Sequence, residues 1–303
     1  SGILIFLILS GIGIIGGAFS VFGAETADIV DYRTFFGFDP RTTVWIIAEL
    51  HLMFGAFVLG VPMFAVTVEY VGVLTKEERY DRLAKDFTRL LSASFALTAA
   101  LGGLLTFALF TLYPKVMTFM SGIFHESFYI YAFFFFGETF VLYFYYYSWD
   151  RLKNRKGIHI SAGVLLNIIG LIIMGISNSW ATYMMSPSGI DPETMKFTGT
   201  LMDAIWNPLW NPLNLHRILG NAVFGGYVAG AYAAVKFLTA QTDEDRAHYD
   251  WMGYVGNFIA IVSLLFLPFA GYYLGREVYS FSPIMGNNMM GGAFSWTFII
   301  QAI

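Results

Sequence analysis

Long apolar stretches alternate with short polar ones along the whole chain. About eight such stretches can be recognised, at 2–22, 43–73, 89–112, 122–149, 158–185, 212–239, 251–275 and 291–303. Each complete stretch reaches the ~20 residues that an α-helix needs to cross a bilayer. The stretches are apolar nearly all round, unlike the one-sided helices of soluble domains. The pattern therefore predicts an all-α, polytopic transmembrane helix bundle that forms a single membrane domain over 1–303.

Composition supports a membrane protein. Of the 303 residues, 57% are hydrophobic and only 13% are charged, which is typical of a chain that spans a bilayer. The chain has no cysteine, so disulfides, thiolate-ligated iron–sulfur clusters and covalently attached c-type haem are excluded within it. No phosphate-binding loop, nucleophile motif or nucleic-acid signature is found, and no nucleic-acid partner is expected.

Lysine and arginine are concentrated in every second connection between the apolar stretches. The connections 74–89 and 150–157 are basic, whereas 23–42, 113–121, 186–211 and 276–290 are richer in aromatic residues, proline and glycine. Because cytoplasmic connections carry the excess of basic residues, the first set is predicted to face the cytoplasm. The chain is also expected to continue beyond Ile303, where an apolar stretch stops short.

One carboxylate lies near the middle of an apolar stretch. Glu138 follows FYIYAFFFFG and precedes TFVLYFYYYSWDRL. An ionisable residue at membrane depth is expensive and usually faces a cavity, a partner or an ion path. Glu138 lies ~18 Å from the cytoplasmic end of its helix, so we interpret it as a proton-path residue. The alternative is a protonated, hydrogen-bonded packing residue. Tyr131 lies seven residues earlier, on the same helix face.

Four candidate metal ligands fall near the outer ends of four different stretches. His51, His125 and His216 are predicted at similar depth, and Met290 precedes the last stretch. Histidine and methionine are axial ligands of haem iron. Haem is favoured over a bare ion, because the cluster of histidines and carboxylates that a bare ion needs is missing. A single intramembrane histidine is equally often a hydrogen-bonding contact between helices.

Glycines accompany two of these histidines. Gly55 follows His51 by four residues, and Gly220 follows His216 by four, so each pair shares a helix face. The glycines would leave room for a flat macrocycle, or would serve close helix packing. Arg217 is interpreted as a partner for a haem propionate or as an interfacial anchor.

Two further histidines, His159 and His248, lie at the predicted cytoplasmic ends of their stretches. Residues at helix ends commonly reach water, so both are interpreted as solvated surface residues.

Several motifs resemble subunit I of the cytochrome bd quinol oxidases, from about Glu49 to Tyr279. The segments LHLMFGAFVLGVPMF and ALTAALGGLLTF are similar to the family's first and second helices. GETFVLYFYYYSWDRL and SNSWATYMMSP resemble two further family motifs. NLHRILGNAVFGGYVAG and NMMGGAF are similar to the segments that supply the family's low-spin haem ligands.

The resemblance implies a set of residue roles. His51 would ligate a high-spin haem, His216 and Met290 a low-spin haem, with Met289 as the fallback for Met290. Glu138 would stand on the family's proton-path glutamate. The cofactor would be haem b, with haem d or more than one haem left open. A second, similar membrane subunit, other respiratory subunits and a bacterial cytoplasmic membrane location are also implied.

The chain departs from the family pattern in several places. Tyr131 stands near the position of a second family glutamate, and Asn288 stands where an arginine precedes the ligand methionine. The connection that forms the family's quinol site shrinks to 276–290. An extra helix over 1–23 precedes a haem-binding bundle over 43–303. The region after the last helix, where the family keeps another haem-ligating glutamate, lies beyond the given sequence.

Three functions remain open from the sequence. The first is a bd-like oxidase subunit that passes electrons from a quinol or an external cytochrome c through haems to oxygen, with protons arriving through Glu138. The second is an electron-transfer haem subunit of a larger quinone or cytochrome complex that reduces no oxygen, favoured by Tyr131. The third is a structural or transporter-like bundle without haem.

Overall fold

The computed structural model describes Thr34 and residues 37–290. Within this part, six helices are long and apolar enough to cross a membrane. They are α2 (Pro40–Thr75), α3 (Glu78–Leu112), α4 (Pro114–Tyr147), α5 (Lys156–Met185), α7 (Trp210–Thr239) and α8 (Asp243–Phe281). Short helices α6 (Leu201–Ile205) and α9 (Pro283–Met290) lie in the connections. The all-α polytopic bundle is confirmed. The segments predicted at 2–22 and 291–303, and the extra helix over 1–23, fall outside the described residues.

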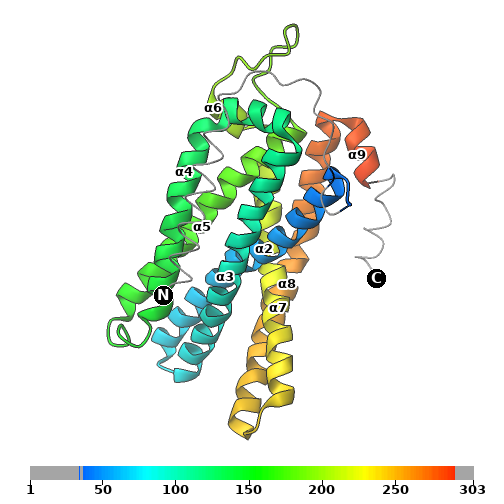
Figure 1. Ribbon diagram of the computed structural model, residues 1–303. Helices are drawn as coiled ribbons and strands as arrows, with labels where there is room; N and C mark the ends of the chain where they lie inside the picture. The colour runs from blue at the N-terminus through cyan, green and yellow to red at the C-terminus, as the bar shows by residue number, and fades with distance from the viewer. Residues whose placement is uncertain (1–33, 35–36, 291–303) are drawn as a thin grey trace.

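The long helices run alongside one another, and α2 occupies the middle of the bundle (Figure 1). Helix α2 packs against α3, α5 and α7, while α4 packs on α5 and α7 pairs with α8. The connections at 76–77, 148–155 and 240–242 lie together at one end, which we call the basic end. The connection from α5 to α7, together with α6 and α9, lies at the opposite end (Figure 1). The described members of the two predicted sets therefore lie at opposite ends, while most of 23–42 falls outside the described residues.

The connections are shorter than the sequence predicts, because the helices extend past their apolar stretches. The connections 74–89, 113–121 and 276–290 were predicted as loops, but most of their residues are helical. Charged residues at a helix end can remain in water while the backbone stays helical, so hydropathy alone underestimates helix length. Helix α8 shows how such an end is stabilised. The Thr242 side chain accepts a hydrogen bond from the Asp245 N–H at 3.1 Å, and acidic residues fill the first turn, where the helix dipole favours them.

Close helix contacts in the bundle depend on glycine. A side chain at Gly60 of α2 would collide with the backbone carbonyl of Asn221 on α7. A Cβ at Gly226 of α7 would lie 2.7 Å from the carbonyl oxygen of Gly256 on α8. Small residues let backbones approach closely where the hydrophobic effect does not drive helix association. These contacts fix α7 between α2 and α8, which positions the histidine of α7.

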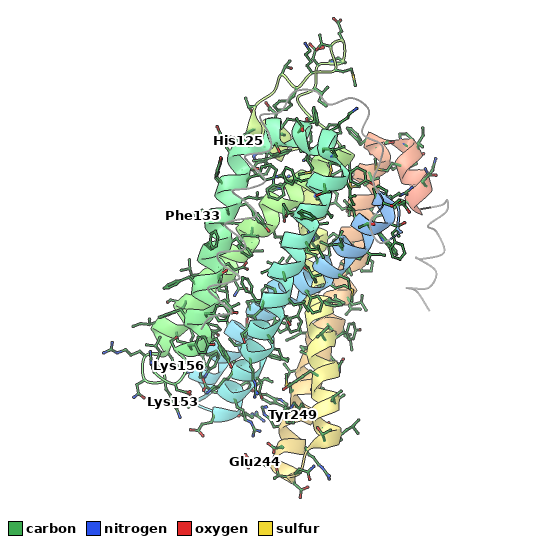
Figure 2. All side chains as sticks on the ribbon, viewed as in Figure 1. His125, Phe133, Lys153, Lys156, Glu244 and Tyr249 are labelled. Carbon is green, nitrogen blue, oxygen red and sulfur yellow. The ribbon has the colours of Figure 1, made fainter. Side chains whose placement is uncertain are left out.

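Large apolar side chains cover much of the outer surface. Phe133 and Phe140 of α4 are each 73% exposed, and Leu238 of α7 is 80% exposed. Phe133 lies on the outer flank of α4 (Figure 2). Exposed apolar surface on this scale fits contact with lipid or with another membrane subunit, rather than with water.

Candidate functional site

The imidazole of His51 is held against α3 by a backbone hydrogen bond. Its Nδ1 lies 3.1 Å from the carbonyl oxygen of Thr98. A carbonyl only accepts hydrogen bonds, so Nδ1 carries the proton and the lone pair lies on Nε2. This is the arrangement that orients histidines toward metals in proteins. His51 is therefore prepared to offer Nε2 as a ligand.

Gly102 of α3 makes the space for the His51 ring. A Cβ at Gly102 would lie 2.9 Å from Cε1 and 3.3 Å from Nδ1 of His51. The sequence suggested Gly55 of α2 for this purpose. A Cβ at Gly55 would meet only Thr98 Cγ2, at 4.0 Å, and would not contact the His51 ring. The role of Gly102 was missed, because the register between α2 and α3 cannot be read from one sequence.

The imidazole of His216 lies between α7 and α8. A Cβ at Gly271 of α8 would lie 3.7 Å from both Cδ2 and Nε2 of His216. A Cβ at Gly220, one turn further along α7, would meet nothing within 4 Å. The open space predicted beside His216 is therefore present, and α8 bounds its other side.

Arg217 links several of the candidate residues. Its Nη1 donates to the Oδ1 of Asn178 on α5, and Asn178 in turn donates to Asn214 at 2.8 Å. The guanidinium is close enough to interact electrostatically with His51, His216 and Tyr131. Side chains from α2, α4, α5 and α7 thus converge around one cation. A propionate role for Arg217 stays a prediction, in which Asn178 would hold the guanidinium in place.

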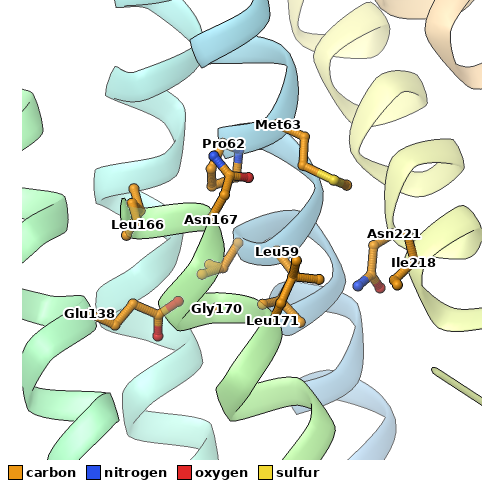
Figure 3. Close-up of a pocket in the computed structure, with 11 residues that line it drawn as sticks. Leu59, Pro62, Met63, Glu138, Leu166, Asn167, Gly170, Leu171, Ile218 and Asn221 are labelled. Carbon is orange, nitrogen blue, oxygen red and sulfur yellow. The ribbon is translucent and has the colours of Figure 1, made fainter. Parts of the chain in front are cut away.

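Glu138 is buried, with 5% of its surface exposed, and it lines a small cavity between α2, α4, α5 and α7 (Figure 3). Its carboxyl points toward Gly170 of α5, where a Cβ would lie 3.4 Å from Oε1. Asn167 and Asn221 supply the other polar groups of the lining. The water-accessible space is about 10 Å³, roughly the room for one water molecule. Glu138 is positioned to exchange a proton with a water in this cavity.

Tyr131 lies on the Glu138 side of α4, as predicted, and interacts electrostatically with Glu138 and Arg217. Its ring packs against two other aromatic rings, with centroid separations of 5.0 Å to Trp180 and 6.5 Å to Phe135. The place of the family's second glutamate is therefore an aromatic environment here.

His125 has an exposed side chain, whereas His51 and His216 are half-buried. Because α4 begins at Pro114, His125 lies about three turns into the helix rather than near its end. Its exposed ring meets Tyr129 edge-to-face, with 5.1 Å between the ring centroids. This exposed placement does not bring His125 toward His51 and His216. Met289 and Met290 end α9, and the Met290 side chain lies outside the described part.

The interpretation of His159 and His248 as solvated residues is wrong. His159 is fully buried and His248 is 7% exposed. His248 Nε2 lies 2.8 Å from Asp86 Oδ2, and His159 contacts Glu69. Both histidines have carboxylate partners on neighbouring helices. These partners could not be predicted from the sequence, because they are far away along the chain.

The fold and these buried polar side chains define a class: a multi-pass, all-α membrane protein with oriented histidines in its interior. Among the described residues, no group of three or more histidine, aspartate or glutamate side chains could hold a bare metal ion. Residues 40–292 match the family "Cytochrome bd terminal oxidase subunit I". The chain belongs to this family, and the resemblance inferred from its motifs is confirmed.

The chain is also similar to two known proteins. It is 24% identical over 218 residues to a protein of Bacillus subtilis (strain 168) named "Putative cytochrome bd menaquinol oxidase subunit I", covering 72% of this chain and 47% of that protein. It is 20% identical to a chain of the bd oxidase structure from Geobacillus thermodenitrificans, with a TM-score of 0.70, over 82% of this chain and 57% of that chain. The structural likeness shows a shared fold. The chain spans about half the length of these relatives.

Gly102→Ala tests how His51 is held. The new Cβ would push the ring off the Thr98 carbonyl, and disturbing such an orienting contact typically costs about 10–100-fold in metal affinity or activity. We expect a comparable loss in haem retained per protein, measured by pyridine haemochrome assay of the purified complex. Gly103→Ala is the matched control, because a Cβ there meets nothing within 4 Å. Equal haem content in both variants would contradict the proposed role of Gly102.

Proposed function

We propose that this chain is the haem-carrying subunit of a bd-type oxidase in a bacterial cytoplasmic membrane. It would receive electrons from a quinol or an external cytochrome c at the end opposite the basic end. The observation that carries the proposal is the His51 imidazole, whose Nδ1 is engaged by Thr98 and whose Nε2 is therefore available. The basic end would face the cytoplasm, since basic connections favour that side.

The side chains present fit haem. Two half-buried histidines, His51 and His216, adjoin positions where glycine replaces side-chain bulk. Arg217 supplies a cation that interacts electrostatically with both. When bound, haem b, or haem d in one site, would supply electron transfer and oxygen chemistry. His51 and His216, with Met290 or Met289, would hold it. Arg217 would offset the negative charge of propionates.

Glu138 would provide the proton for this chemistry. Its carboxyl borders a cavity with room for about one water, and it makes no hydrogen bond within the described part of the chain. A buried carboxyl without a charged partner can bind or release a proton without breaking an ion pair or a hydrogen bond to another side chain. Tyr131 would line the same face of α4.

The connection between α8 and α9 bears on the electron donor. Only Ser282 separates Phe281 from Pro283, so a long loop does not form between these helices. The quinol-binding loop that the family resemblance implies is thus short here, which supports an external cytochrome c alongside a quinol as the donor. A second membrane subunit and further respiratory subunits would complete the assembly.

The second candidate is an electron-transfer haem subunit that reduces no oxygen. It is favoured by Tyr131, which packs among aromatic rings where the family carries a carboxylate. Carbon monoxide separates the candidates, because it binds a reduced haem only when an axial position is open. We expect a carbon monoxide difference spectrum from the dithionite-reduced, purified complex. Haem without this signal would favour the second candidate, and absence of extractable haem would reject both.

A further inference from the structure

A cluster of buried polar side chains near the basic end takes no part in the site described above. It joins four helices: Glu69 of α2, Asp81 of α3, Tyr145 of α4, and Lys156 and His159 of α5. Glu69 accepts hydrogen bonds from the Tyr145 hydroxyl at 2.8 Å and from Lys156 Nζ at 3.0 Å. Lys156 also pairs with Asp81, and Trp149 donates to Asp81 at 3.1 Å.

The geometry requires a proton between Glu69 and His159. His159 Nε2 lies 2.8 Å from the backbone carbonyl oxygen of Tyr145, which can only accept, so Nε2 carries hydrogen. His159 Nδ1 lies 2.7 Å from Glu69 Oε1. A bare Nδ1 and a carboxylate oxygen are both acceptors and would repel at that distance. One proton must therefore sit on Nδ1 or on Oε1.

The formal charges of the cluster also indicate a proton between Glu69 and His159. Without that proton, Glu69, Asp81 and Lys156 leave one uncompensated negative charge in the cluster. With it, the formal charges cancel. Both Glu69 and His159 have side chains that are 0% exposed, and an unbalanced charge in such surroundings is costly. Each release of the proton must therefore be followed by its replacement.

Water reaches this cluster from the basic end. A recess of about 850 Å³ is lined by charged residues of α2, α3, α5 and α8, among them Glu69, Asp81 and Lys156. Lys153, Lys156, Glu244 and Tyr249 lie around this end (Figure 2). Side-chain exposure falls from 32% at Asp81 to 18% at Lys156 and 0% at Glu69. The cluster thus extends from solvent at Asp81 to the buried interior of the bundle at Glu69. At its rim, the Lys85 ammonium, 2.8 Å from Asp150, holds the pKa of that carboxyl below its usual range.

The inner side of the cluster leads toward Glu138. Tyr145 and Glu138 are seven residues apart on α4, about 10 Å along one face. On α5, His159 is followed on one face by Gly163, Asn167 and Gly170, the last two lining the Glu138 cavity. The Val66 and Tyr145 side chains crowd against Gly163 and close the passage. Rotation of these two side chains would admit a chain of waters along this face.

We propose that the Glu69–His159 pair stores one exchangeable proton and passes it toward Glu138. The proposal rests on the proposed function, since it supplies that site with protons. A proton from water in the recess forms the N–H bond at Nδ1 or the O–H bond at Oε1. That bond breaks when the nearest molecule in a chain of waters takes the proton. Each water passes one proton on, and a new O–H bond forms on the ionised carboxylate of Glu138. Recess water refills the pair, and no electrons move.

Glu69→Gln tests the pair with little change in shape. The amide N–H can donate to Nδ1 of a neutral His159, and the amide oxygen can accept from Tyr145. The contact with His159 therefore survives without an exchangeable proton. Lys156 loses Oε1 as an acceptor but keeps its ion pair with Asp81. In the complete complex, we expect unchanged haem absorbance and an oxygen-reduction rate lowered on the order of tenfold or more. The loss should deepen as pH rises and bulk protons become scarce.

His248→Gln is the matched control. It alters another buried histidine near the basic end that faces a carboxylate, Asp86 at 2.8 Å, but it leaves the pair intact. We expect this variant to turn over at the wild-type rate. A wild-type rate and pH profile in Glu69→Gln would overturn the proposal.

Infrared difference spectra provide a readout that does not depend on turnover. Comparison of wild type with Glu69→Gln or His159→Gln, in H₂O and in D₂O, should show one exchangeable proton shared by a carboxyl and an imidazole. Detection of an ionised carboxylate together with a neutral imidazole in the wild type would overturn the pair. If the complex holds haem but reduces no oxygen, the proposed function fails, and the infrared bands alone decide whether the proton is stored.

Discussion

Replacing Glu138 with glutamine is expected to lower oxygen reduction by about 10²–10⁴-fold, the range typical of removing a positioned proton donor. Glutamine matches the size of glutamate, so it should preserve the contact with Gly170 and the shape of the cavity. It cannot bind or release a proton at neutral pH. The haem absorbance should therefore stay unchanged while turnover falls, measured with an oxygen electrode on the purified complex.

Glu126→Gln provides the comparison for this prediction. Glu126 is an exposed carboxylate on the same helix, so its replacement removes the same charge from α4 without touching the cavity. We expect turnover near the wild-type rate. If Glu138→Gln also turned over at that rate, the buried carboxyl would be a packing residue, which is the alternative left open by the sequence.

Much of the fold could be predicted from hydropathy. The six described spanning helices coincide with predicted stretches, because a bilayer demands about twenty apolar residues regardless of sequence detail. The helix ends could not be predicted in this way. Helix α3 begins at Glu78, eleven residues before the start of the apolar stretch predicted at 89–112. Its charged first turns pack beside α2 and α8 at the basic end, and only tertiary contacts reveal this.

The residues of the candidate site could likewise be predicted only in part. Glu138 could be identified in advance because a carboxylate in mid-membrane is costly and needs a reason. Gly102 and Thr98 could not, since they act on His51 from another helix. His159 was misread because a residue near a helix end can face either water or the bundle. The deciding fact is Glu69 at 2.7 Å, ninety positions away in sequence.

His51→Gly is expected to remove one haem from the complex, a larger effect than the ~10–100-fold loss from disturbing a supporting contact. In the proposed function the imidazole is the ligand itself, and no other histidine of the described chain is linked to the Thr98 carbonyl. Reduced-minus-oxidised spectra should lose the component that reacts with carbon monoxide, and oxygen reduction should fall with it. His216→Gly should instead remove a component that does not react with carbon monoxide.

Added imidazole distinguishes ligation from packing. In His51→Gly the vacated space beside Gly102 is the size of the missing ring, so free imidazole can enter it and supply the nitrogen donor. Recovery of the carbon-monoxide-reactive component with imidazole, but not with a similarly sized apolar ring such as cyclopentane, would mean that the nitrogen matters and not the volume. If His51→Gly kept its full spectrum without imidazole, His51 would be a contact between α2 and α3. The haem assignment would then have to rest on His216 alone, and a site for oxygen would be lacking.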